Sequence, residues 1–181
     1  MKSEPVKLTR DCQATAIPGG EQIELRQGDS VIISQALGGT FTVMTEEGYL
    51  ARIAASDADA LGQEVPRPAA AVEEEGLTLE DRVRAELKSV YDPEIPVDIV
   101  ELGLIYGVEI ASLPDGQSKV HVTMTMTAPG CGMGDVIRDE VLDKLRALPG
   151  VGEVKVEIVL DPPWEPSRMS EAARLATGMY W

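Results

Sequence analysis

A single cysteine stands among glycines in the segment APGCGMG, residues 128–134, and it is the side chain of this chain best suited to chemistry. Gly130 and its neighbouring glycines leave the backbone bare, so another molecule or a metal could approach the sulfur of Cys131 closely. The thiolate would be the nucleophile or the metal ligand. Alternatively, the glycines serve only a tight turn and the cysteine packs as a small hydrophobic side chain. The residues alone leave both interpretations open.

Two regular elements flank this segment and would position the cysteine. The alternating run KVHVTMTMT, residues 119–127, predicts a strand, and apolar residues recur at helical spacing in residues 135–148. Cys131 is therefore expected just before the first turn of a helix. Unpaired backbone N–H groups and the helix dipole favour an anion at that place. We therefore expect the pKa of the Cys131 thiol to be lowered.

The other residues limit what Cys131 could do. The chain has one histidine, His121, in the middle of the predicted strand and, at ~3.3 Å per residue, about 20 Å from the cysteine along that strand. We therefore expect no Cys–His dyad within one chain. Zinc and iron–sulfur sites normally have four ligands, so Cys131 would need carboxylates, Cys12, a second chain or an external thiol to hold a metal. Such a site would hold its metal transiently.

A second group of polar side chains occurs in YDPEIPVDIVELG, residues 91–103, where Asp92, Glu94 and Asp98 surround two prolines. The prolines keep the segment extended and rigid, which would position the carboxylates. In the alternative interpretation these acids end a helix and cap the following turn, with Asp98 as the cap. Acid–base work by the carboxylates would require an apolar pocket.

The segments around these residues predict a small α+β domain over residues 77–181. Its elements are expected in the order α-β-β-α-β-α, with helices on one face of a three-stranded sheet. Thr78 and Asp81 have the spacing of a capping box at the start of the first helix. The remaining elements are a hairpin whose strands lie in 102–113 and 119–127, a helix in 135–148, a strand in 152–160 and a short helix in 167–176.

Residues 1–61 have a different pattern, with short runs rich in Val, Ile, Thr and Phe that are broken by Gly pairs or Gly-Asp. This spacing predicts a small all-β, barrel-like domain. Residues 62–76 contain Pro, Ala and three consecutive Glu without a hydrophobic period, and we interpret them as a linker. The chain is thus expected to have two domains.

Composition excludes several classes of partner. With 16 Lys and Arg against 31 Asp and Glu, the net charge is −15, which argues against nucleic acid and against an anionic membrane. No window approaches the ~20 apolar residues of a membrane span, and the first residues lack the apolar core of a secretory signal. We expect a cytoplasmic protein whose two cysteines are thiols.

Three stretches together resemble a known family. DPEIPVDIVELGLIYGV, VTMTMTAPGCGMGDVI and LPGVGEVKVEIVLDPPWEPSRMSEAAR follow, in order, the pattern of the small domain of iron–sulfur assembly and targeting factors. With LTRDCQATAIPGG near the start, the chain is similar to the longer SufT branch of that family. The resemblance covers residues 77–176 closely and the first 65 more loosely.

The resemblance implies a role in maturing iron–sulfur proteins beside the SUF machinery, not an enzyme with its own turnover. It places the family's reactive cysteine at Cys131, with Thr127 and Gly130 in the same element. It places the Asp-Pro-Glu element at Asp92 and Glu94. Many shorter relatives have Asn where this chain has Asp98, so the side-chain amide of those relatives is absent here. They have Pro where this chain has Gly132, so the loop after the cysteine is expected to be more flexible. The N-terminal signature falls on Arg10, Asp11 and Cys12, with no role assigned.

Two functional hypotheses follow. In the first, Cys131 briefly holds iron or an iron–sulfur cluster, or contacts its donor, while other surfaces dock SUF assembly proteins and recipient apo-proteins; two chains could pair to complete the site. In the second, Cys131 is the nucleophile of a thiol-dependent enzyme acting on a small substrate, with the acidic segment as its acid–base partner. The single histidine and the absence of a nearby resolving cysteine in the sequence count against the second.

Overall fold

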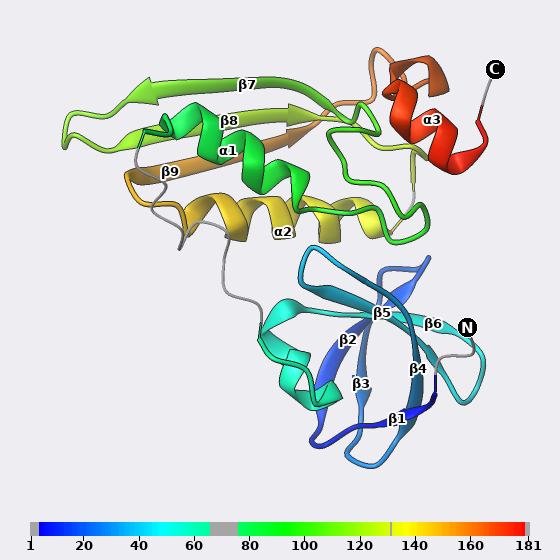
Figure 1. Ribbon diagram of the computed structural model, residues 1–181. Helices are drawn as coiled ribbons and strands as arrows, with labels where there is room; N and C mark the ends of the chain where they lie inside the picture. Colours follow the sequence, from blue (N-terminus) through cyan, green and yellow to red (C-terminus); the bar gives the residue numbers. More distant parts are fainter. Residues whose placement is uncertain (1–3, 66–75, 131, 180–181) are drawn as a thin grey trace. The chain divides into compact units, whose positions relative to one another are not determined.

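The computed structural model describes residues 4–65, 76–130 and 132–179, and it forms two compact units (Figure 1). The first unit includes residues 4–65, and the second includes 76–130 and 134–179. The segment predicted as a linker, 62–76, falls for the most part on residues 66–75, which lie outside the described residues. The predicted domain boundaries therefore stay a prediction.

Over residues 4–65, the regular elements of the first unit are β-strands apart from the 3-10 helix η1. Its described strands form one antiparallel six-stranded sheet in the order β1-β4-β5-β6-β2-β3, which curls around its own core (Figure 1). This confirms the small all-β domain. The strands are β1 Val6–Lys7, β2 Cys12–Ile17, β3 Gln22–Leu25, β4 Ser30–Leu37, β5 Thr40–Thr45 and β6 Leu50–Ile53, and η1 is Ala55–Leu61.

Strand β2 was not predicted, although it lies between β6 and β3 in the sheet. Its inward positions include Cys12 and Ala14, small side chains that give a weak hydrophobic alternation. The N-cap of η1 is Ala54, which makes no side-chain capping hydrogen bond. The core of the unit consists of inward side chains of the sheet and the buried residues of η1, among them Leu25, Val31, Phe41, Val43, Ala51, Ile53, Ala58 and Leu61.

The second unit has the predicted order α-β-β-α-β-α. Strands β7 and β8 form the predicted antiparallel hairpin, and β9 pairs with β8 in parallel after the crossover through α2. The elements are α1 Leu79–Lys88, β7 Ile105–Ser112, β8 Ser118–Met124, α2 Met133–Arg146, β9 Val151–Ile158, the short 3-10 helix η3 Pro166–Arg168, and α3 Glu171–Thr177. The α+β fold class is therefore confirmed.

Helix α1 begins as its sequence indicates. The Thr78 side chain accepts a hydrogen bond from the Asp81 backbone N–H, and the Asp81 side chain accepts one from the Thr78 N–H, which completes the capping box. Val83 and Leu87 then face the core, together with α2 side chains and the buried face of β8. Helices α1 and α2 thus cover one face of the three-stranded sheet (Figure 1).

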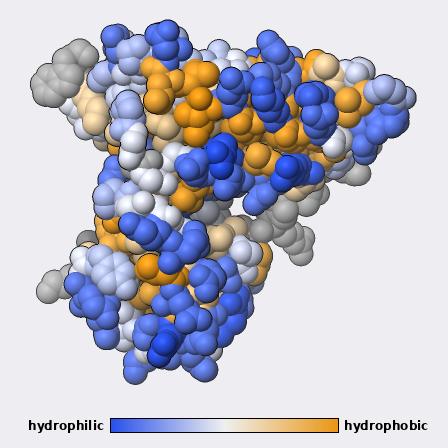
Figure 2. Space-filling model, turned by 180° about the vertical axis from the view of Figure 1, so that it is seen from behind, coloured by the Kyte–Doolittle hydropathy of each residue, from blue (hydrophilic) through white to orange (hydrophobic). Residues whose placement is uncertain are grey.

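The visible surface is mainly hydrophilic. In Figure 2 hydrophilic side chains cover most of the first unit's visible face, while hydrophobic side chains interleave with charged ones on the second unit. This agrees with a net charge of −15. Within the described residues, no helix combines the length and apolar character needed to cross a membrane.

Candidate functional site

The end of β8 is held by backbone hydrogen bonds from both sides. Thr125 N–H donates to the Leu104 carbonyl at 2.8 Å, and Val159 N–H donates to the Met124 carbonyl at 2.8 Å. Thr125 is only 1% exposed, and its hydroxyl has no hydrogen-bond partner among the described residues. The chain therefore leaves the sheet from a fixed point and turns toward α2.

The turn toward α2 becomes exposed after Thr127. Thr127 is half-buried, residues 128–130 are exposed, and Gly130 has a φ of +83°, a left-handed conformation that side chains with a Cβ rarely adopt. Cys131 lies outside the described residues, so its lowered pKa and its contacts stay predictions. The 14-residue helix α2 begins at Met133, close to the predicted start, and has the acidic Asp135 in its first turn.

The acidic segment uses its carboxylates to cap its own turns. Asp92 is buried, and its Oδ1 accepts hydrogen bonds from the backbone N–H groups of Glu94 and Ile95, both at 2.9 Å. Asp98 Oδ1 accepts from Val100 and Glu101, both at 3.0 Å. Of the three predicted acids, only Glu94 is exposed. The geometry therefore favours a capping role for Asp92 and Asp98 over a role in acid–base catalysis.

The chain after β9 returns to this segment and packs on it. Trp164 Nε1 donates to the Leu102 carbonyl at 2.8 Å, and Ser170 N–H donates to the Glu101 carbonyl at 2.9 Å. Glu101 also has a lowered pKa, first because the Ser170 hydroxyl donates to its carboxylate and then because Lys88 does. Contacts between residues some 60 positions apart thus fix the loop that follows Asp98. Met169 of the same returning segment is buried in the core of this unit.

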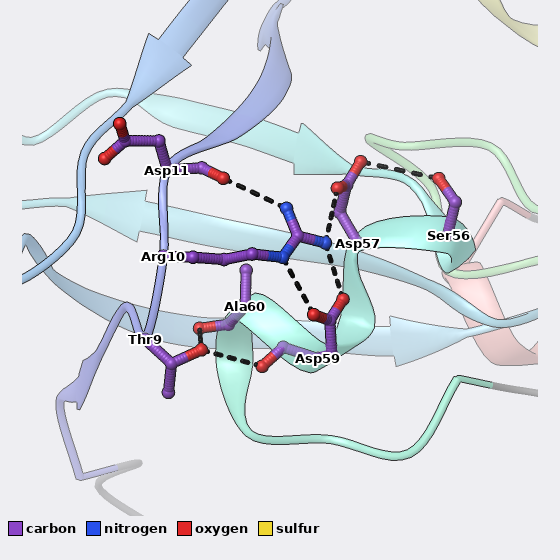
Figure 3. A network of polar contacts seen from close by, with 7 residues as sticks. All are labelled: Thr9, Arg10, Asp11, Ser56, Asp57, Asp59 and Ala60. Carbon is purple, nitrogen blue, oxygen red and sulfur yellow. Dashed lines mark hydrogen bonds and ion pairs between the residues drawn. The ribbon is translucent and has the colours of Figure 1, made fainter.

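The N-terminal signature forms a clamp within the first unit, shown in Figure 3. Arg10 donates to both oxygens of Asp59 at 2.8 and 2.6 Å, to Asp57 at 2.8 Å, and to the Asp11 carbonyl at 3.0 Å. These carboxylates raise the pKa of the guanidinium, Asp59 most. Thr9 adds a hydrogen bond from its hydroxyl to the Asp59 carbonyl at 2.9 Å. Arg10 therefore holds η1 beside the start of β2.

The other two signature residues are also used inside this unit. The Asp11 carboxylate accepts from Gln27 N–H at 2.7 Å, which fixes the turn before β4. Cys12 is a free thiol, 5% exposed and part of the core. Burial raises the pKa of the Cys12 thiol, and the charge of Asp57 raises it further. A buried thiol of this kind is a poor nucleophile and a poor metal ligand, so Cys12 has a structural role.

His121 lies on the open face of the three-stranded sheet, where strand alternation predicts it. Its Nε2 is 3.3 Å from Glu157 Oε2, and its Nδ1 is 3.7 Å from Glu109 Oε2. Its ring thus lies between carboxylates of the two flanking strands. Within the part of the chain that the structure describes, no three His, Cys, Asp or Glu side chains are grouped to hold a metal ion. The metal role assigned to Cys131 falls outside that part.

One polar cluster was not predicted. Glu86 is 3% exposed on the apolar side of α1, and its Oε1 has no hydrogen-bond partner among the described residues. Lys144 of α2 donates to the Ser89 hydroxyl at 2.7 Å, and that hydroxyl donates to the Glu86 carbonyl at 2.7 Å. Helices α1 and α2 are therefore joined by polar contacts as well as by the core. The sequence does indicate the burial of Glu86, because it follows Val83 by three residues and therefore lies on the same, buried face of the helix.

A three-stranded sheet with helices on one face, and a glycine-rich turn leading into its crossover helix, defines the class of small α+β domains to which this unit belongs. The profile of the family described as iron–sulfur cluster assembly protein matches residues 80–158. Relatives that are more than 40% identical to the chain are also matched over nearly their full length. The chain belongs to this family.

Two curated relatives show the extent of the likeness. The chain is 42% identical over 101 residues to the Fe-S protein maturation auxiliary factor YitW of Bacillus subtilis, covering 56% of this chain and 95% of that protein. It is 41% identical over 90 residues to the Fe-S protein maturation auxiliary factor SufT of Staphylococcus aureus, covering 50% and 98%. Among solved structures, a DUF59 domain from Bacillus anthracis is 39% identical, with a TM-score of 0.48 over 56% of this chain and 93% of that one.

Proposed function

We propose that this protein is a maturation factor for iron–sulfur proteins, which acts with the SUF machinery and delivers clusters or iron to recipient apo-proteins in the cytoplasm. The observation that carries the proposal is membership of the iron–sulfur cluster assembly family over residues 80–158, a stretch that contains the acidic segment, the end of β8, the glycine-rich turn and α2. Relatives at 41% and 42% identity are named as Fe-S protein maturation auxiliary factors.

Cys131 is the residue assigned to contact iron or a cluster in this proposal. The turn that contains it begins at the fixed end of β8 and leads directly into the first turn of α2, a place that favours a thiolate. Cys12 is excluded from that role by its burial. One thiolate leaves a metal incompletely coordinated, so the cargo would be held transiently, with the remaining ligands supplied by the donor, the recipient or a second copy of the chain.

The positions of the histidine and of the acidic segment support a maturation factor that is not itself an enzyme. A thiol enzyme needs a base near its nucleophile, but His121 lies between Glu109 and Glu157 in the middle of the sheet face. The carboxylates of Asp92 and Asp98 are hydrogen-bonded to the backbone of their own turns. These contacts count against His121, Asp92 and Asp98 as acid–base partners of Cys131.

The test is the specific activity of an iron–sulfur enzyme such as aconitase in cells that lack this protein. Complementation uses the wild type, Cys131→Ala or Cys12→Ala at equal abundance of folded protein. We expect the wild type and Cys12→Ala to restore activity and Cys131→Ala to fail. Full rescue by Cys131→Ala would show that the cysteine is dispensable, and unchanged aconitase in the deletion would overturn the function itself.

A further inference from the structure

Strand β9 is an open edge of the sheet in the second unit. The strand order is β7-β8-β9, and among the described residues no strand pairs with β9 on the side away from β8 (Figure 1). The pairing of β9 with β8 runs without a shift of register from Glu153 to Ile158, and its eight residues include no proline. An edge of this kind presents unpaired N–H and C=O groups to another polypeptide. Strand β9 is therefore able to continue the sheet into a second molecule.

The register identifies the backbone groups of β9 that point outward. Val159 N–H donates to the Met124 carbonyl of β8 at 2.8 Å. Because backbone groups alternate in direction along a strand, every second residue of β9 hydrogen-bonds to β8, and the residues between them have outward N–H and C=O groups. These outward residues are Val154, Val156 and Ile158.

The side chains along this edge are apolar on one face of the sheet and charged on the other. On the helix-covered face Val154 is buried, and Val156 and Ile158 are partly buried against the core. On the open face negative, positive and negative side chains alternate, and all three are exposed. The three charged residues are Glu153, Lys155 and Glu157. An apolar row and a row of alternating charge thus follow the same edge.

Strand β7, the other edge of the sheet, is less suited to pairing. Its pairing with β8 has a register shift between Ile105 and Gly107, and irregular edges hinder the addition of another strand. The charged residue within β7 is Glu109, whose side chain is 84% exposed. Pairing of β7 with itself near Glu109 would bring like charges together. Charge therefore distinguishes the two edges.

We propose that two copies of this chain pair through β9, antiparallel and across a twofold axis at Val156. Val156 then lies opposite Val156 of the second copy, and Val154 lies opposite Ile158, so the outward backbone groups of the two strands hydrogen-bond to each other. The same register places Lys155 opposite Glu157 of the second copy, and the pair occurs twice because a twofold interface is isologous. Each Glu157 would lie between two lysines, because Lys155 of its own chain is 3.0 Å away.

Charge also selects this register over the neighbouring ones. An axis at Lys155 would place the two lysines opposite each other and would oppose glutamates of the two copies. An axis at Val154 would place Gly152 opposite Val156 and leave the apolar row incomplete. Exposed ion pairs add little affinity, so the charges set the register while the backbone hydrogen bonds and the apolar row hold the pair. The net charge of −15 on each copy opposes association, so we expect a reversible dimer.

The experiment measures the mass of the full chain by sedimentation velocity from about 1 µM to about 1 mM, a range that spans moderate to weak association. Excess reductant and a chelator are present, so disulfides and bridging metal ions cannot link the copies. We expect a reversible increase from the 19.4 kDa of one chain toward twice that mass. A monomer at every concentration, or assemblies that keep growing beyond two copies, would overturn the proposal.

Charge variants test the register with the fold kept, because the altered side chains are exposed. Lys155→Glu makes the charged row of the edge wholly negative and should raise the dissociation constant about tenfold. The exchanged variant Lys155→Glu/Glu157→Lys restores opposite charges across the axis and should dimerise like the wild type. Lys119→Glu makes the same change of charge on the same face in the central strand β8 and should leave the dimer unchanged. The proposal fails if the exchange does not rescue pairing or if Lys119→Glu weakens it equally.

Cysteine variants locate the axis directly. Facing residues at positions without backbone hydrogen bonds have Cα atoms about 4.5 Å apart, within the roughly 4.4–6.8 Å that a disulfide spans. On mild oxidation a mixture of Lys155→Cys and Glu157→Cys chains should therefore form a mixed disulfide, and neither variant alone should link to itself. Self-linking of Lys155→Cys, or no linking in the mixture, would overturn the register. Both variants also carry Cys131→Ser, so no readout involves iron or Cys131 and the outcome is independent of the proposed function.

Discussion

The two cysteines of this chain are expected to differ sharply in reactivity. Cys12 is buried in the first unit's core, and its pKa is raised by that burial and by Asp57. Alkylation requires an accessible thiolate, so Cys12 in the native protein should stay unmodified by iodoacetamide at about pH 8, near the ordinary pKa of a free thiol. Mass spectrometry of the labelled peptides measures this directly.

The control for this labelling is Cys131→Ser, which leaves Cys12 as the one thiol of the chain. That variant should gain a single adduct in denaturant and none in its native state over the same time. Equal labelling rates in both states would show that the position of Cys12 in the core is wrong.

The Arg10 clamp predicts a specific loss of stability in acid. Asp59 has a lowered pKa in the folded protein, first because Arg10 donates to it. The unfolded chain therefore takes up a proton on Asp59 more readily, so the clamp's contribution is present above the ordinary Asp pKa of about 3.9 and is lost as the pH falls through the folded value. The thermal midpoint of Asp59→Asn should thus lie below that of the wild type near neutral pH, and the gap should close in acid. A gap that persists unchanged to about pH 2 would contradict the clamp.

At the scale of elements, local signals were readable and long-range contacts were not. The capping box of α1 and the hairpin of β7 and β8 are set by residues close in sequence, and both were predicted. The capping turns of Asp92 and Asp98 are equally local and stood among the interpretations left open. Strand β2 was missed because its partners are β3 and β6, and its inward side chains are small.

The docking of the C-terminal tail shows the same limit for the candidate site. Trp164 reaches the Leu102 carbonyl across 62 positions, and no spacing rule links two such residues. The clamp of Arg10 with Asp57 and Asp59 likewise spans nearly 50 positions. Contacts of this kind depend on how the elements pack, so a single sequence identifies the residues without their partners.

Gly103 is the position at which this docking should be most sensitive. It has a φ of +71°, and a Cβ there would clash with the Arg168 carbonyl oxygen. Gly103→Ala therefore adds a left-handed backbone cost of about 1–2 kcal/mol to a clash that pushes the tail away. We expect a lower free energy of unfolding and faster proteolysis of the tail after Ile158, measured by urea denaturation and limited digestion.

Gly116→Ala is the matched control, because Gly116 has a φ of +84° with no atom within 4 Å of the added Cβ. It should show the backbone cost alone and leave the tail as resistant to protease as in the wild type. Equal effects of the two variants on the tail would remove the packing explanation.

At the scale of the whole molecule, each unit has a core made of its own residues. The core of the first unit draws its buried side chains from Leu8 to Leu61, and that of the second from Val83 to Ala173. The second core contains both helices that cover the sheet and also receives the tail. The segment 77–181, which includes the second core, has about 105 residues, and segments of that length commonly fold alone when their core is complete.

A fragment of residues 77–181 should therefore fold by itself, with a cooperative unfolding transition and the helix and strand content of the intact second unit. It retains the capping box at Thr78, the end of β8 and the segment of the family match, so it also separates two possible roles of residues 1–61. If the fragment folds and restores aconitase in the deletion strain, maturation resides in the second unit and the first unit is dispensable for it. If the fragment folds and fails, the first unit is required for maturation itself. Loss of cooperative unfolding in the fragment would show that the two cores are not independent.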